Sequence, residues 1–361
     1  MNLDDLPTPT LLVDESRLDA NIARMQARCN ANGVALWPHV KTHKTVEIAR
    51  KQLAAGAAGL TCAKLGEAEA LLPSGVRRVF VAFPLVDIRQ AERLHYLADA
   101  LDELLLAATS LAQAQALDAL LEAANVSVGI LLGVDSGLGR EGVRSSEDAQ
   151  AVATFVRRSP RMRLVGLFTH EGHAYSANGE DAARQTAHDA HTRLLESRAA
   201  LRDPALTLWP GCSITAQYMA ELPDVYAVRP GAYVFGDLLL SQVTQTMRAS
   251  EVALTVLATV ADHPAPGLAL LDAGAKTLSG DKTPGGICAS AFDKRDIHVT
   301  RVSEEHGWAT GNDVDTLHVG DRLRLMPAHV CPAVNLANEL VVLHDDTVTD
   351  RWTVAARGRV Q

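Results

Sequence analysis

Residues 103–135 read ELLLAATSLAQAQALDALLEAANVSVGILLGVD, and this stretch decides the expected fold. Apolar runs at Glu103–Thr109 and Val126–Asp135 flank a helix-patterned segment at Leu111–Ala124, which predicts a strand, a helix and a second strand. Six more strand candidates lie at Ala35–Lys41, Gly59–Lys64, Arg78–Pro84, Leu164–Thr169, Leu206–Pro210 and Tyr226–Gly231. Eight strands that alternate with helical segments predict a closed (β/α)8 barrel. An open, doubly wound sheet is the alternative, but no G-x-G-x-x-G motif follows the first strand.

The pattern changes after Asp237, where helical periodicity nearly vanishes. Strand candidates in this second region are Val252–Ala261, Leu268–Asp272, Ile297–Ser303, Arg322–Met326, Glu339–Leu343 and Arg351–Ala355. We therefore expect a barrel domain over residues 1–240 and an antiparallel β domain over residues 241–361. The opening strand Thr10–Val13 can pair with either domain, so residues 1–14 can belong to the β domain.

Composition excludes several classes of protein. The chain has 361 residues, 47% of them hydrophobic, and a net charge of −9. An acidic chain without a long Lys/Arg run is a poor candidate for binding nucleic acid or an anionic membrane. No apolar run approaches 18 residues, so we expect no membrane span. The N-terminus carries no signal-peptide pattern, and the five cysteines are scattered, which favours a reducing, cytoplasmic location.

Unusual residues follow several of the expected strands, at the end of a barrel where chemistry collects. Lys41 ends the first strand, and a lysine desolvated in a barrel mouth can form a Schiff base. Arg140 lies between glycines after the fifth strand and can direct a cation at a ring oxygen or a carboxylate. An exposed loop lysine and an ordinary strand-to-helix loop are the plainer interpretations.

Three later strand ends complete this set. His170 and Tyr175 follow the sixth strand, where a ring can stack on a flat cofactor and a phenol can donate a hydrogen bond. The loops after the seventh and eighth strands are the usual phosphate position in such barrels, because small residues leave backbone N–H groups free. The candidate residues in these two loops are Gly211, Ser213, Arg229, Gly231 and Tyr233.

The β domain contains a candidate metal pair. His329 and Cys331 are two residues apart, and if they lie on a strand they face the same side. An imidazole and a thiolate suit Zn²⁺, with water or substrate completing a catalytic site. A buried thiol beside a structural histidine is the plainer interpretation of this spacing.

These pieces, in this order, resemble the fold-type III pyridoxal phosphate (PLP) enzymes with the alanine racemase-like barrel. Within them the chain is similar to the D-serine dehydratase and D-threonine aldolase family. The most specific parts are Pro38-His39-Val40-Lys41-Thr42-His43-Lys44 and the pair His329 and Cys331. The resemblance runs over nearly the whole chain, from Thr8 to Gly358.

The resemblance implies a role for each candidate. Lys41 matches the lysine that binds PLP covalently, Arg140 the arginine that approaches the PLP ring, and His170 and Tyr175 the residues beside that ring. The positions associated with phosphate binding are Gly211, Ser213, Gly231 and Tyr233, and Arg229 also follows the family pattern. His329 and Cys331 match the ligands of a divalent metal, for which a thiolate favours zinc over manganese or magnesium. A family stretch also matches Glu305-His306-Gly307, without an assigned role.

Two lyase activities divide this family. A D-serine dehydratase eliminates water from the β-carbon and yields a keto acid and ammonia, whereas a D-threonine aldolase breaks the Cα–Cβ bond and yields glycine and an aldehyde. The His-x-Cys pair, the spacing from His170 to Tyr175, and Arg229 follow the dehydratases, whereas Val334-Asn335-Leu336 and the tail look like the aldolases. Residues near the reaction centre favour the dehydratase. The resemblance leaves D-serine, D-threonine and 3-hydroxy-D-aspartate open as substrates.

Two other functions are possible on this fold. An amino-acid racemase needs a second base, often a tyrosine of the β domain, but no tyrosine follows Tyr233. A non-catalytic PLP-binding protein is a barrel without a β domain, which the residues after 240 disfavour. The family forms dimers, so the resemblance also predicts a homodimer, with His329 and Cys331 near the PLP of the same or of the other subunit.

Overall fold

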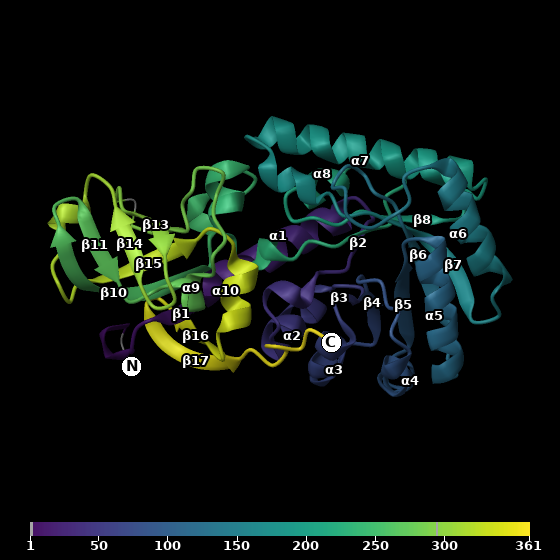
Figure 1. The fold of residues 1–361 in the computed structure, drawn as a ribbon, viewed down its shortest axis with the longest axis horizontal. Helices are drawn as coiled ribbons and strands as arrows, with labels where there is room; N and C mark the ends of the chain where they lie inside the picture. Colours follow the sequence, from purple (N-terminus) through teal and green to yellow (C-terminus); the bar gives the residue numbers. More distant parts are fainter. Residues whose placement is uncertain (1–2, 294) are drawn as a thin grey trace.

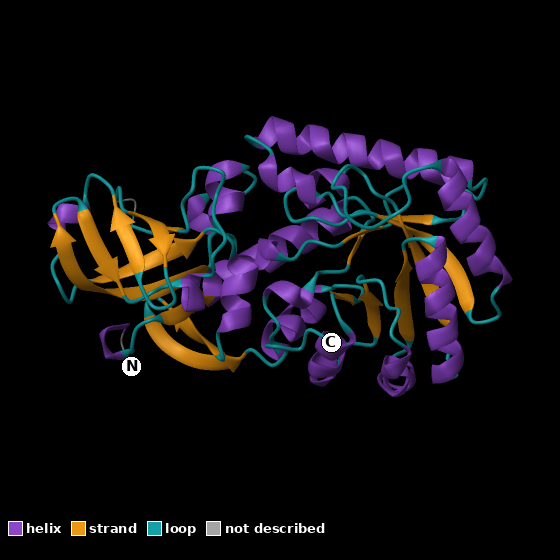
Figure 2. Cartoon of the chain, viewed as in Figure 1, coloured by secondary structure: helices purple, strands orange, loops and turns teal. Residues whose placement is uncertain are grey.

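The computed structural model of the chain describes residues 3–293 and 295–361. Two strand-rich parts lie side by side, and Figure 1 shows the chain passing from the smaller part into the larger one along helix α1 (Glu15–Ala31). Figure 2 shows strands enclosed by long helices in the larger part and mostly strands in the smaller one. None of the helices in the described residues is both long and apolar enough to span a membrane.

The larger part contains eight parallel strands, namely β2 (Ala35–Leu36), β3 (Leu60–Cys62), β4 (Arg78–Val81), β5 (Glu103–Ala108), β6 (Val128–Gly133), β7 (Met162–Phe168), β8 (Thr207–Trp209) and β9 (Ala227–Val228). Strands β3 to β8 form one sheet, and β2 pairs with β9. Bridges join His39 to Thr61 and Leu208 to Val225, so the β2–β9 pair is connected to both ends of that sheet. The (β/α)8 arrangement expected from the sequence is therefore confirmed.

The helices around these strands are α1, α2 (Val46–Ala55), α3 (Leu65–Leu71), α4 (Ala91–Ala100), α5 (Leu111–Ala124), α6 (Ser146–Arg158), α7 (Glu180–Ala200) and α8 (Ala216–Met219). Side chains alternate across each strand between the helices and the barrel interior. In β5, Leu104 and Leu106 pack with the helices, whereas Leu105 and Ala107 pack with the aromatic residues inside. Trp37, Phe80, Phe168 and Trp209 fill that interior and form its floor.

The smaller part is a nine-stranded sheet made of β1 (Thr10–Asp14), β10 (Leu254–Ala265), β11 (Leu268–Leu271), β12 (Ala289–Ala291), β13 (His298–Val302), β14 (Gly307–Thr310), β15 (Arg322–Pro327), β16 (Glu339–His344) and β17 (Thr347–Thr353). Its order is β11-β14-β13-β12-β15-β10-β1-β16-β17, and β11 also pairs with β10, which closes six strands into a small barrel. The expected antiparallel β domain is confirmed. Strand β1 joins it, antiparallel to β10 and parallel to β16.

Short elements complete the fold: α9 (Ala275–Leu278), α10 (Val330–Leu336), the 3-10 turns η1 (Leu3–Asp5), η2 (Val40–Thr42), η3 (Leu72–Ser74), η4 (Ile88–Gln90), η5 (Gly172–Ser176), η6 (Ala232–Val234), η8 (Ala249–Glu251) and η9 (Val314–Thr316), and the π-helical turn η7 (Leu239–Val243). Several strand predictions differ from the structure, and β2 and β9 are much shorter than the predicted Ala35–Lys41 and Tyr226–Gly231. Strands β12 and β14 were not expected, and β17 begins and ends earlier than predicted. β12 and β14 are only three and four residues long, and most residues of β17 are exposed, so none of them carries a clear apolar pattern.

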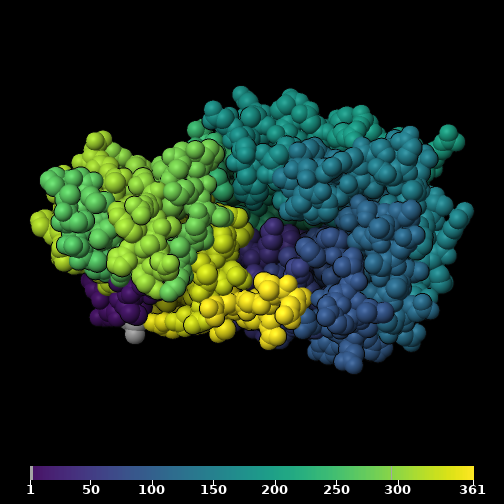
Figure 3. All heavy atoms as spheres, viewed as in Figure 1, coloured from purple at the N-terminus to yellow at the C-terminus, as the bar shows by residue number. Residues whose placement is uncertain are grey.

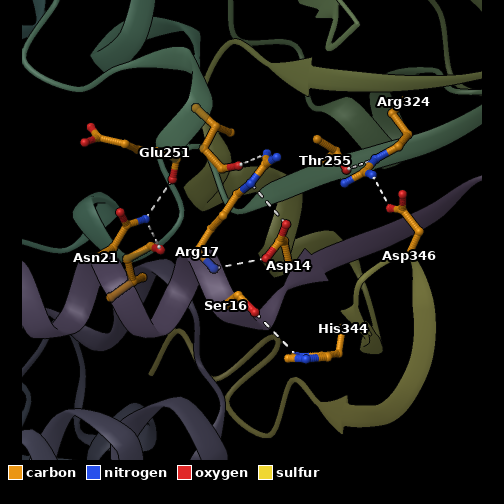
Figure 4. A network of polar contacts seen from close by, with 11 residues as sticks. Asp14, Ser16, Arg17, Asn21, Glu251, Thr255, Arg324, His344 and Asp346 are labelled. Carbon is orange, nitrogen blue, oxygen red and sulfur yellow. Dashed lines mark hydrogen bonds and ion pairs between the residues drawn. The ribbon is translucent and has the colours of Figure 1, made fainter.

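The junction between β1 and α1 ties the two parts together, as Figure 4 shows. The Asp14 carboxylate caps α1 by accepting the backbone N–H of Arg17 at 3.0 Å, and the Arg17 guanidinium donates to the carbonyl of Val252. One turn later, the Asn21 amide donates to the carbonyls of Val234 and Glu251. Helix α1 is therefore fixed both to the last barrel segment and to the chain entering β10.

Candidate active site

A cavity of about 390 Å³ opens at the carboxyl ends of the barrel strands. It is lined by His39, Lys41, Thr42, Leu138, Arg140, His170, Gly172, Tyr175, Gly211, Cys212, Ser213, Arg229, Gly231, Ala232, Leu239, His329 and Cys331. Ten of the eleven residues predicted from the sequence are therefore brought together around one space. The barrel supplies most of the wall, and the first turn of α10 supplies His329 and Cys331.

Lys41 lies in the short turn η2 and does not end the first strand as expected, because β2 already ends at Leu36. The turn begins at His39, whose ring nitrogen Nδ1 accepts the Lys41 backbone N–H at 3.4 Å. Buried Val40 and Thr42 hold the turn on both sides of Lys41. A neighbouring hollow of about 280 Å³ is also lined by Lys41, so the lysine borders space on two sides.

Arg229 is buried at the base of the cavity. Its guanidinium donates to the carbonyls of Thr169 and Trp209 and lies 5.4 and 5.3 Å from the ring centres of Phe80 and Phe168. Burial lowers the pKa of Arg229 to about 10, so the side chain stays a cation at neutral pH. A fixed, buried cation here can face an anionic or electron-rich group above it.

His170 has one ring nitrogen already engaged. Its Nδ1 lies 2.5 Å from the carbonyl of Gly211, and because a carbonyl only accepts, Nδ1 must carry the hydrogen. Burial, followed by the positive charge of Lys41, lowers the pKa of His170 to about 3. The ring is therefore neutral at physiological pH, with its Nε2 unprotonated.

The cavity carries a strong positive charge. Lys41, Arg140 and Arg229 line it, and no aspartate or glutamate is among the described residues that do. Burial and then the charges of Lys41 and Arg229 hold the pKa of His39 well below its ordinary value, which reflects the same field. A cofactor with a phosphate group and a ring oxygen fits this charge, and a lysine amine in the same cavity fits its aldehyde.

The two loops expected at a phosphate approach each other closely. The backbone N–H of Gly231 donates to the Ser213 hydroxyl at 2.9 Å. A side chain at position 231 would meet the Thr42 hydroxyl at 2.7 Å and the His39 carbonyl at 3.0 Å. Glycine is therefore required where the loop after β9 packs against the turn that carries Lys41.

Arg140 reaches the cavity from a more open loop after β6. The Asp135 carboxylate shapes this loop by accepting the backbone N–H groups of Gly137 and Gly139. The guanidinium of Arg140 pairs with the Glu141 carboxylate, and about half of its side chain is exposed. Arg140 is thus a cation at the rim, in contrast to the buried Arg229.

Tyr175 lies in η5, after the sixth predicted strand. Burial, followed by the neighbouring Cys212, Cys331 and Asp237, raises the pKa of Tyr175 well above its ordinary value. The phenol is therefore protonated and can donate a hydrogen bond. Its ring centre lies 6.2 Å from that of His329, so Tyr175 stands between the barrel loops and the metal pair.

His329 and Cys331 do not lie on a strand, and that expectation was wrong. Strand β15 ends at Pro327, His329 immediately precedes α10, and Cys331 lies in its first turn. Pro332 explains the change, because proline suits a first helical turn and cannot continue a central strand. The two side chains nevertheless line the same cavity.

The metal pair contacts the turn that carries Lys41. The Cys331 sulfur lies 3.1 Å from the Thr42 hydroxyl. Although burial raises the pKa of Cys331, the neighbouring His329 and Lys41 outweigh that effect, so the pKa of the thiol lies below its ordinary value. A nitrogen and a sulfur donor fit a zinc-like ion, although residues 3–293 and 295–361 contain no group of three or more metal-binding side chains, at this site or at any other. Water or substrate would complete the coordination.

Tyr233 is the predicted residue that does not line this cavity. Its hydroxyl accepts a hydrogen bond from Gln52, and the residue lines a separate hollow beside α1. Ser213 borders both spaces. Tyr233 therefore supports the loop after β9 from behind.

Several residues of the site were not predicted from the sequence. Thr42 and His39 lie in the stretch around Lys41, and Glu171 follows His170, so their position next to predicted site residues could have indicated them. Buried Glu171 accepts the backbone N–H of Gly211 and the hydroxyl of Thr215. Asp237 and Asp281, which contact the segment that carries His329, gave no such signal because they lie far from it in the sequence.

Two family models match the chain. The model described as "Alanine racemase, N-terminal domain" matches residues 13–238, and the model described as "Putative serine dehydratase domain" matches residues 253–343. The chain is 32% identical over 360 residues to D-threonine aldolase from Arthrobacter sp., which covers 97% of this chain and 93% of the relative. It is 33% identical over 355 residues to D-threo-3-hydroxyaspartate dehydratase from Delftia sp. (strain HT23), which covers 90% of this chain and 91% of the relative.

Solved structures of D-threo-3-hydroxyaspartate dehydratase variants have the same fold. In one, alanine replaces a histidine, and the TM-score is 0.89 at 30% identity over 98% of this chain and 96% of that chain. In a metal-free one, alanine replaces a cysteine two positions further along, and the TM-score is 0.87 at 30% identity over 98% of both chains. The first family model matches more than half of the chain, and the two relatives are at least 32% identical over at least 90% of it; the chain therefore belongs to the D-serine dehydratase and D-threonine aldolase family of alanine racemase-like PLP enzymes.

Proposed function

We propose that the protein is a PLP- and divalent-metal-dependent lyase of the D-serine dehydratase type, which eliminates water from D-3-hydroxy amino acids and yields a keto acid and ammonia. One observation carries the proposal: Lys41 of the barrel and the pair His329 and Cys331 of the β domain line a single cavity. Thr42, the residue that follows Lys41, contacts Cys331, so the lysine and the metal pair lie close together. Lys41 can therefore act at Cα, and a metal ion on His329 and Cys331 at the β-hydroxyl, of the same small substrate.

The barrel residues would bind and orient the cofactor. Lys41 would hold its aldehyde carbon, and Arg229 would face its ring from the base of the cavity. The phosphate would be bound by the loops at Gly211, Ser213 and Gly231. When bound, PLP supplies an electron sink for charge that develops at the substrate Cα.

The remaining barrel residues would act on protons and charge. Lys41 Nζ would carry the proton removed from Cα, because it is the amine that lines the cavity. Neutral His170 would offer Nε2 as an acceptor beside the ring. Protonated Tyr175 would donate from its hydroxyl, and Arg140 would attract the substrate carboxylate at the rim.

His329 and Cys331 would hold the metal ion. Two protein ligands leave coordination positions for the β-hydroxyl of the substrate, and a divalent ion there acts as a Lewis acid that helps hydroxide to leave. A thiolate ligand favours zinc over manganese or magnesium. We also propose a homodimer, on the strength of the family alone.

The dehydratase reaction is preferred because of the metal pair. In the related dehydratase, solved variants replace a histidine and a cysteine two positions apart, and the second is metal-free. His329 and Cys331 have the same spacing. The alternative is cleavage of the D-threonine aldolase type, which is favoured by 32% identity over nearly the whole chain to such an aldolase.

Product analysis distinguishes the two reactions. The purified enzyme with PLP and zinc is incubated with D-serine and with D-threonine, and products are identified by chromatography. We expect pyruvate and ammonia from D-serine, with activity lost after chelation and regained with zinc. The Cys331→Ala variant should keep the absorbance of bound PLP but lose turnover. Glycine and acetaldehyde from D-threonine, without a keto acid, would instead establish the aldolase.

A further inference from the structure

We propose that Asp281 is a positioning residue for the metal pair, an inference that rests on the proposed function and adds a residue to its site. Asp281 lies in the loop between α9 and β12, 48 residues before His329. Its carboxylate oxygen Oδ2 is 2.8 Å from Nδ1 of the His329 ring. Neither the family motifs nor the sequence pattern indicated this carboxylate.

The contact fixes which nitrogen of His329 can bind a metal. A carboxylate accepts, so Nδ1 carries a hydrogen and donates it to Asp281, and Nε2 is the nitrogen that remains for a metal ion. Histidine ligands usually donate their other N–H to a carboxylate or carbonyl, which sets the ring orientation and makes the ligand nitrogen a better donor. Asp281 stands in that position toward His329.

A second carboxylate restrains the backbone of the same segment. Asp237 is fully buried and accepts the backbone N–H of Val330, the residue between the two ligands, at 3.1 Å. Its other oxygen accepts the backbone N–H of Leu240 at 3.0 Å. Asp237 thus holds the main chain of the segment, whereas rotation of the His329 ring is restrained by Asp281.

A simple surface ion pair is the competing explanation. The Asp281 side chain is 53% exposed and that of His329 is 28% exposed. Ion pairs at such exposed sites usually contribute little to stability. Replacing Asp281 should therefore leave folding nearly unchanged, and an effect on metal affinity can be measured without a large effect on the fold.

The test measures zinc affinity in the PLP-loaded protein by competition with a chromogenic chelator. Wild type should bind one zinc ion per chain, and Cys331→Ala should lose that binding. Asp281→Ala should bind zinc about 10–100-fold more weakly. Asp281→Asn keeps an accepting oxygen without the charge, and its zinc affinity should lie between those of wild type and Asp281→Ala. Asp99→Ala is the matched control, because it removes an aspartate that pairs with His95 at 3.4 Å on the outer helix α4.

The outcomes distinguish a failure of the role of Asp281 from a failure of the proposed metal site. Equal zinc affinity in wild type and Asp281→Ala, with binding lost in Cys331→Ala, overturns the role of Asp281 and leaves the proposed function intact. Equal affinity in wild type and Cys331→Ala overturns the metal site itself. If Asp281→Ala does not fold, Asp281→Asn decides: an affinity equal to that of wild type counts against the role of the charge.

Discussion

Position 211 requires glycine because Arg229 lies directly beside it. A Cβ at this position would lie 2.6 Å from the Cζ atom of Arg229. The arginine cannot move aside easily, because its guanidinium is hydrogen-bonded to two carbonyls and packs against the rings of Phe80 and Phe168. The glycine therefore permits a buried cation at the base of the cavity.

Replacing Gly211 with alanine should displace Arg229. We expect a loss of stability of about 1–3 kcal/mol from overpacking, together with weaker PLP binding in an absorbance titration. Gly280→Ala is the control, because no atom lies within 4 Å of the Cβ it would add. Unchanged PLP affinity in Gly211→Ala would mean that Arg229 does not face the cofactor.

At the scale of elements, the segment after β17 connects the β domain to the turn η2 and the start of α3. Lys44 ends the motif around Lys41, and its buried ammonium is 2.8 Å from the Glu67 carboxylate of α3. The backbone N–H of Ala356 donates to the Lys44 carbonyl, and that of Gly66 donates to the Gln361 carbonyl. Figure 3 shows this yellow segment lying against the blue barrel. The C-terminal end of η2 is thereby held twice: Thr42 by its contact with Cys331, and the following Lys44 by this segment.

Glu67→Gln should therefore lower the free energy of unfolding far more than the same substitution at a neighbouring glutamate of the same helix. It leaves the Lys44 ammonium buried without a carboxylate, for which we expect a loss of about 3–5 kcal/mol. Glu69→Gln is the matched control, since its pair with Arg93 is partly exposed and contributes less than about 1 kcal/mol. Urea denaturation of both variants checks this, and similar losses would contradict it.

At the scale of the whole molecule, buried neutral histidines link folding to pH. His43 is fully buried between Thr45 and Gln52, and burial lowers its pKa from 6.5 to about 3. Between these two values the unfolded chain binds a proton at this position and the folded chain does not. The free energy of unfolding therefore rises with pH across this window and stops rising above about pH 6.5.

We expect His43→Gln to reduce this slope by up to about 1.4 kcal/mol per pH unit. The free energy of unfolding is measured from pH 4 to pH 7 in urea, and slopes are compared rather than absolute stabilities. The exposed His188 gives the control variant His188→Gln, which should keep the wild-type slope. An unchanged slope in His43→Gln would show that His43 is protonated in the folded state.

Much of the candidate site followed from the order of motifs along the chain. The carboxyl ends of parallel barrel strands meet on one face, so Lys41, His170 and Gly211 could be expected together before any contact was known. Tyr233 lies behind the cavity and not in its lining, because a residue in the right loop can point to either side of it. Asp281 had no sequence signal, because a loop side chain has no periodicity that links it to a histidine 48 residues away.

The sequence by itself determined the barrel, the β domain and the kinds of donor that they carry, because apolar periodicity and proline or glycine positions act within a few residues. Tertiary structure alone decided that β1 pairs with β10 and β16, that His329 and Cys331 line the same cavity as Lys41, and that the Asp281 carboxylate faces His329. These features depend on which distant segments meet when the chain closes, and local backbone preferences do not encode that choice.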